Sequence, residues 1–123
     1  MPPRRRTDPE AGRAAVRSWA HNPDGAPRAT IATAVRYSLE ELAARYPGHT
    51  LELRVPPFGV VQCLEGPRHT RGTPPNVIET DAQTWLSLVD GRLRWPDAVA
   101  GGAVRASGSR ADLTSLLPLD EPS

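Results

Sequence analysis

The sequence predicts an α+β domain, and three patterns support this fold class. Apolar residues recur every three or four positions through residues 28–46, which is typical of an amphipathic helix. Apolar and charged residues then alternate through residues 51–55, and a second extended run covers residues 58–64. A further helical pattern follows near residues 81–90. The chain has 123 residues, enough for one domain with one core.

The N-terminal part predicts a tail followed by a short helix. Residues 1–7 hold three arginines and two prolines and nothing to bury, so we expect a disordered basic tail there. Asp8 is suited to cap a helix, and Pro9 suits its first position. The sequence Asn-Pro-Asp-Gly at residues 22–25 predicts a turn that ends this helix. Residues 8–27 are therefore expected to form a helix and a linker.

The middle of the chain predicts a long helix followed by a hairpin. The apolar residues of the helix advance along one face; they are Ile31, Val35, Leu39, Leu42 and Tyr46. Pro47 and Gly48 end this pattern. The two extended runs that follow are joined by Pro-Pro-Phe-Gly, so we expect them to pair as antiparallel strands.

The last third predicts a short strand, a helix, a helical turn, a strand and a closing helix. The strand covers residues 77–80, and Asp81 is suited to cap the next helix, which Gly91 ends. A helical turn is expected at residues 95–100 and a strand at residues 103–107. Ser109 and Asp112 have the spacing of a capping box, which predicts a final helix with an apolar face made by Leu113, Leu116 and Leu117.

Residues 28–119 resemble the sterol carrier protein 2 (SCP2-like) domain, in particular short bacterial proteins of the sterol carrier family. The positions that carry the resemblance are Thr80, Asp81, Trp85, Leu88, Gly91, Arg92, Ala98, Gly102, Val104, Ser107 and Gly108. The resemblance implies a twisted, mainly antiparallel sheet of about four or five strands, covered on one side by helices. It also implies a non-catalytic domain that binds a hydrophobic or amphipathic ligand such as a fatty acyl chain or a sterol-like lipid. Residues 120–123 would be a tail.

Two groups of residues are candidates for ligand binding. The first would supply an apolar lining and equally suits an ordinary core; it comprises Trp85, Leu88, Val99, Leu113, Leu116 and Leu117. The second belongs to the polar loop before residue 77, where Arg68, His69 and Arg71 could hold a carboxylate or phosphate. A surface loop stiffened by proline explains the second group as well.

Other classes of function have less support. Cys63 and His69 could form a nucleophile and base, but a buried inert thiol is the simpler interpretation of a cysteine within a strand. The single cysteine and three separated histidines lack zinc-ligand spacing, and we expect no cofactor. A protein-interaction or enzyme-accessory module of the same fold, with a closed pocket, remains the alternative.

Charge and hydropathy indicate which classes of partner to expect. The excess of arginine over acidic residues lies in the N-terminal tail rather than on the domain, so nucleic acid is not an expected partner. No apolar region follows the N-terminal arginines and no apolar run is long enough to span a membrane, so we expect no signal peptide, no stable membrane insertion and a cytoplasmic protein. The expected partner is a hydrophobic or amphipathic small molecule, with a protein partner as a second possibility.

Overall fold

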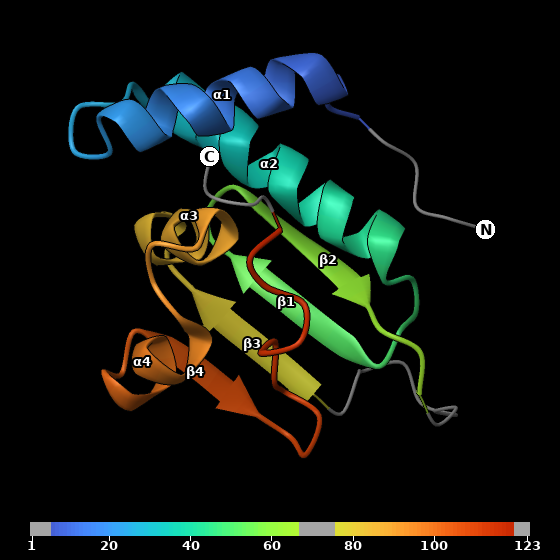
Figure 1. The fold of residues 1–123 in the computed structure, drawn as a ribbon. Coiled ribbons are helices and arrows are strands. Elements are labelled where there is room, and N and C mark those ends of the chain that lie inside the picture. Colours follow the sequence, from blue (N-terminus) through green and yellow to red (C-terminus); the bar gives the residue numbers. More distant parts are fainter. Residues whose placement is uncertain (1–5, 67–75, 120–123) are drawn as a thin grey trace.

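The structure is a computed structural model that describes residues 6–66 and 76–119. These residues form four helices and four strands. In chain order the elements are α1 (Pro9–His21), α2 (Arg28–Arg45), β1 (Leu51–Val55), β2 (Gly59–Cys63), β3 (Asn76–Thr80), α3 (Ala82–Asp90), α4 (Trp95–Ala100) and β4 (Val104–Ser107). The strands form one sheet in the order β2-β1-β3-β4. Figure 1 shows α2 and α3 against the sheet, with α1 outside α2.

The sheet is mainly antiparallel, as predicted. β1 pairs antiparallel with β2, and β3 pairs antiparallel with β4, while β1 and β3 run parallel in the middle. The predicted hairpin is confirmed, with Leu53 opposite Val61. The α+β fold class is confirmed as well.

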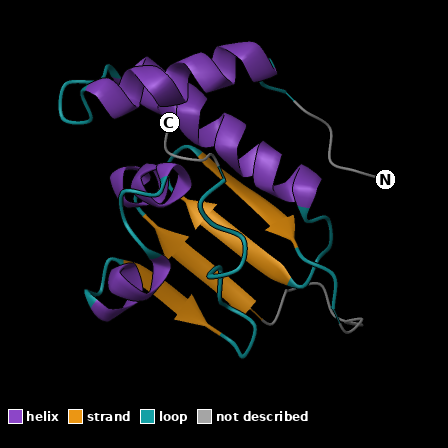
Figure 2. Cartoon of the chain, in the orientation of Figure 1, coloured by secondary structure: helices purple, strands orange, loops and turns teal. Residues whose placement is uncertain are grey.

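One face of the sheet is covered and the other is open (Figure 2). In β1 the side chains of Leu51, Leu53 and Val55 are buried, whereas Glu52 and Arg54 alternate with them and pair with each other on the opposite face. β3 alternates in the same way, with Ile78 fully buried. This period of two places the core between the sheet and the helices.

Helix α2 is buried on two sides, which a single apolar stripe did not predict. Its buried residues are Ala32, Ala34, Val35, Tyr37, Ser38, Leu39, Leu42 and Ala43. The predicted stripe residues Ile31 and Tyr46 are only partly buried. The reason is that α2 lies between the sheet and α1: a Cβ added to Gly12 of α1 would come within 2.4 Å of the Tyr37 ring.

The capped helix ends follow the sequence signals. The Asp8 side chain accepts a hydrogen bond from the Ala11 N–H, and Asp81 accepts one from the Thr84 N–H at 2.8 Å. Gly91 ends α3 in the left-handed region with φ 86°. A glycine is needed there because other residues are strained at that φ.

The predicted final helix is wrong. Residues 108–119, here called the C-terminal segment, contain turns but no helix. Asp112 does not complete a capping box; its Oδ1 accepts hydrogen bonds from the N–H and hydroxyl of Thr114, at 2.8 and 2.6 Å. Such a local bond competes with helix formation, and the few residues left before Pro118 are too short to form a stable helix alone.

Candidate functional site

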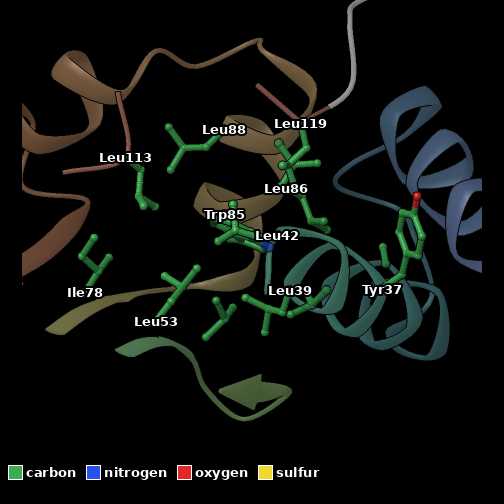
Figure 3. Packing of buried hydrophobic residues seen from close by; sticks show 14 of the residues in the cluster. Tyr37, Leu39, Leu42, Leu53, Ile78, Trp85, Leu86, Leu88, Leu113 and Leu119 are labelled. Atoms are coloured by element: carbon green, nitrogen blue, oxygen red, sulfur yellow. The ribbon is translucent and has the colours of Figure 1, made fainter. Parts of the chain in front are cut away.

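An apolar layer lies between α3, the covered face of the sheet and the C-terminal segment. Figure 3 shows Leu113 of the segment among Leu88 of α3 and the strand residues Ile78 and Leu53. Each of these side chains is at most 1% exposed. The segment crosses the strands (Figure 1) and covers part of the sheet face with an irregular chain in place of a helix.

Trp85 lies at the centre of this layer and makes a buried polar connection to α2. The Trp85 indole N–H donates to the Ser38 hydroxyl oxygen at 2.8 Å. Ser38 in turn donates toward the carbonyl of Ala34, also at 2.8 Å, one helical turn earlier. Both residues are fully buried, so the bond satisfies two groups that would otherwise lose water without replacement.

Within the part of the chain that the structure describes, few hydrogen bonds join the C-terminal segment to the rest of the fold. The amide of Asn76 connects both sides: its Nδ2 donates to the Thr50 carbonyl at 3.0 Å, and its Oδ1 accepts from the Arg110 N–H at 2.9 Å. At the far end, the Leu119 N–H donates to the Val89 carbonyl at 3.0 Å. The Leu119 carbonyl accepts from Arg45 of α2 at 2.8 Å. Apolar contact therefore holds most of the segment in place.

Five of the six residues proposed as an apolar lining lie in this region. Trp85, Leu88 and Leu113 are enclosed, and Leu116 and Leu117 are partly buried against the core. Val99 differs, because its side chain on α4 is 43% exposed. Arg68, His69 and Arg71, the proposed polar group, lie outside the described residues. Sequence patterns did not single out Asn76, because its role depends on a partner 34 residues away.

A second feature is a groove between α2 and the edge strand β2. It encloses about 710 Å³ and is lined by Arg6, Thr7, Arg36, Leu39, Glu40, Ala43, Phe58, Gly59, Val60 and Val61. None of the six proposed lining residues belongs to this groove. The groove was not predicted, because it forms only where the tail, a helix and a strand meet.

Cys63 lies at the end of β2 with its side chain fully buried. Burial raises the pKa of its thiol from 9.0 to about 12. At pH 7 only about one thiol in 10⁵ would then be a thiolate, the form that acts as a nucleophile. The geometry supports the inert interpretation of this cysteine.

Within residues 6–66 and 76–119, no three His, Cys, Asp or Glu side chains are grouped as metal ligands would be. The helices of the same residues are also too short or too polar to span a membrane.

The fold and the apolar layer together define an α+β domain of the sterol-carrier type, with helices and an apolar segment over one face of an open sheet. The family model described as bacterial SCP ortholog matches residues 27–119, and the chain belongs to this family. Such a domain is generally a non-catalytic lipid carrier or lipid-binding module. No curated protein matches the sequence.

Proposed function

We propose that the protein carries an acyl or sterol-like lipid whose apolar body lies beneath the C-terminal segment, against α3 and the covered face of the sheet. The observation that carries the proposal is the makeup of this cover. It is an irregular chain that contributes Leu113, Leu116, Leu117 and Leu119 to the core. Membership of the bacterial SCP family supports the class of ligand.

A ligand would gain space there by lifting the segment. The leucines of the segment would leave the sheet, and the hydrocarbon of the ligand would take their place. Here the main polar connections to the fold are the Arg110–Asn76 bond and the two bonds at Leu119.

The energies favour a long ligand over a short one. Exposing a buried leucine costs about 1.5–3 kcal/mol, so moving the four leucines of the segment costs at most roughly 6–12 kcal/mol, and less because Leu116 and Leu117 are only partly buried. Each buried methylene of a ligand contributes about 0.8 kcal/mol, so a chain with a dozen buried methylenes contributes about 10 kcal/mol. A long-chain acid can offset the displacement, and a six-carbon acid cannot.

Thermal unfolding with and without fatty acid tests the proposal. Palmitate at a hundredfold excess over its Kd is expected to raise Tm by more than about 5 °C, because it binds the folded state only. Hexanoate, which has the same carboxylate, is expected to leave Tm unchanged. Leu116→Asp, at a partly buried position of the segment, should remove most of the palmitate effect because it places a charge in the lipid path.

Ala14→Asp is the matched control, since Ala14 is exposed on α1 away from the layer. It should keep the full palmitate effect. Equal stabilisation of the two variants, or no stabilisation of the unchanged protein by palmitate or by cholesterol, would contradict the proposed site.

A further inference from the structure

The outer side of β2 carries backbone groups that the sheet does not use. Among the strands of residues 6–66 and 76–119, β2 is an edge strand and pairs with β1 alone. The Thr50 carbonyl accepts from the Asn76 side chain on β3 at 3.0 Å, so the N–H of the next residue, Leu51, points the other way, toward β2. Leu51 pairs with Cys63, and hydrogen-bonded pairs alternate along an antiparallel ladder, so the N–H and C=O groups of Val60 and Gln62 point away from β1. Such an edge is a template for another strand.

The edge is closed at one end and open at the other. The Leu64 N–H donates to the Tyr46 carbonyl at 2.8 Å, so the chain after α2 covers this end. Gly48 lies so close that an added Cβ would come within 1.9 Å of the Leu64 carbonyl oxygen. Between Gly59 and Val61, the edge instead borders the 710 Å³ groove.

Helix α2 forms the opposite wall of this groove. Arg36, Leu39, Glu40 and Ala43 line it at helical spacing. Leu39 and Ala43 are fully buried below, and Arg36 is exposed above, where its Nε donates to the Phe58 carbonyl at 3.3 Å. A groove with a helix on one wall and an edge strand on the other suits an extended peptide, which gains main-chain bonds from the strand and side-chain contacts from the helix.

The charges of the groove favour an acidic occupant. Arg6 and Arg36 both line it, and Arg28 lies over the ring of Phe58 with 5.1 Å between guanidinium carbon and ring centre. Glu40 is the acidic lining residue, and its Oε1 already accepts from the Thr7 N–H at 3.0 Å. The groove therefore offers cations to a carboxylate above an apolar floor.

The polar backbone groups at the edge of β2 favour a peptide over a lipid as the occupant of the groove. Hydrocarbon laid along β2 would remove water from the outward groups of Val60 and Gln62 and supply no hydrogen bond in return, which is unfavourable. A β-strand would replace those bonds. We propose that the groove between α2 and β2 binds an extended peptide that adds a strand to β2, with an acidic side chain at Arg36 and an apolar side chain two residues along over Leu39 and Ala43.

The test uses synthetic peptides and amide NMR of the full chain. The probe is the acetylated, amidated heptapeptide Ser-Thr-Glu-Thr-Val-Thr-Ser, and its matched control has arginine in place of glutamate. The probe is expected to shift the amide signals of Val60 and Gln62 in a saturable way, and the control to bind at least about tenfold more weakly, as loss of a charge-assisted bond predicts. A probe N-methylated at its three central residues should not bind.

Charge reversal makes the result specific to this groove. Arg36→Glu should reverse the preference, so that the arginine peptide binds better than the glutamate peptide. Arg105→Glu, an equivalent change on the other edge strand, should leave the preference unchanged because Arg105 is exposed on β4. The proposal is overturned if the probe shifts no amide of β2, if the N-methylated probe binds equally well, or if palmitate rather than peptide shifts these amides.

Discussion

The bond between Trp85 and Ser38 shows how single residues fix the position of the apolar layer. Two fully buried polar groups from different helices satisfy each other at 2.8 Å, and this orients the indole within the core. Sequence periodicity could predict that Trp85 is buried but not that its nitrogen faces α2. Position along a helix indicates a face, whereas a partner 47 residues away depends on how the helices cross.

Cys63 predicts a specific dependence of stability on pH. The folded state raises the pKa of this thiol to about 12, whereas in the unfolded chain it titrates near 9.0. Below pH 9 both states hold the proton, so the contribution to stability is complete. As pH rises from 9 toward 12, the unfolded state loses the proton first, and the free energy of unfolding should fall.

Urea unfolding at pH 8 and pH 10 measures this effect. The comparison is with Cys63→Ala, which is less stable throughout but should lose less stability between the two pH values, because the titrating group is absent. Parallel losses in the two proteins would show that Cys63 does not contribute to the pH dependence.

At the scale of elements, the contact between α1 and α2 rests on a glycine. Gly12 is buried, and an added Cβ would lie 2.2 Å from Cγ of the Tyr37 ring. Alanine is favoured over glycine in a helix by about 1 kcal/mol, but overpacking at this distance requires one helix to shift and costs more. Gly12→Ala is therefore expected to lower the free energy of unfolding by about 1–3 kcal/mol. Arg13→Ala, at the exposed neighbouring position, should change it by less than about 0.5 kcal/mol.

Elements were predictable to the extent that their signals are local. The period of α2, the alternation of β1 and the cap at Asp81 are all read from neighbouring residues, and each element is present. The prediction of a final helix was wrong because it also used only local signals: Ser109 and Asp112 suit a helix cap whether or not a helix follows. The partner of Asp112 is Thr114, two residues later, and this bond forms a turn.

At the scale of the whole molecule, some features follow from local sequence patterns, and others depend on contacts between residues far apart in the sequence. The fold class and the family agree with the predicted order of elements, and five of the residues proposed as a lining belong to the core or pack against it. The Asn76 connection and the groove beside β2 could not be predicted, because each brings together residues from three separate parts of the chain. Val99 suits a lining by residue type, yet its side chain is 43% exposed on α4.

The most direct test of the carrier proposal is residue-resolved amide hydrogen exchange with and without palmitate. We predict faster exchange at the amides of Arg110 and Leu119, because a lipid beneath the C-terminal segment breaks their bonds to Asn76 and Val89. The strand amides of Leu53 and Ile78 should exchange more slowly, because binding stabilises the folded state. Slower exchange at all four amides, or no change at any of them, would contradict the proposal that the lipid lies beneath this segment.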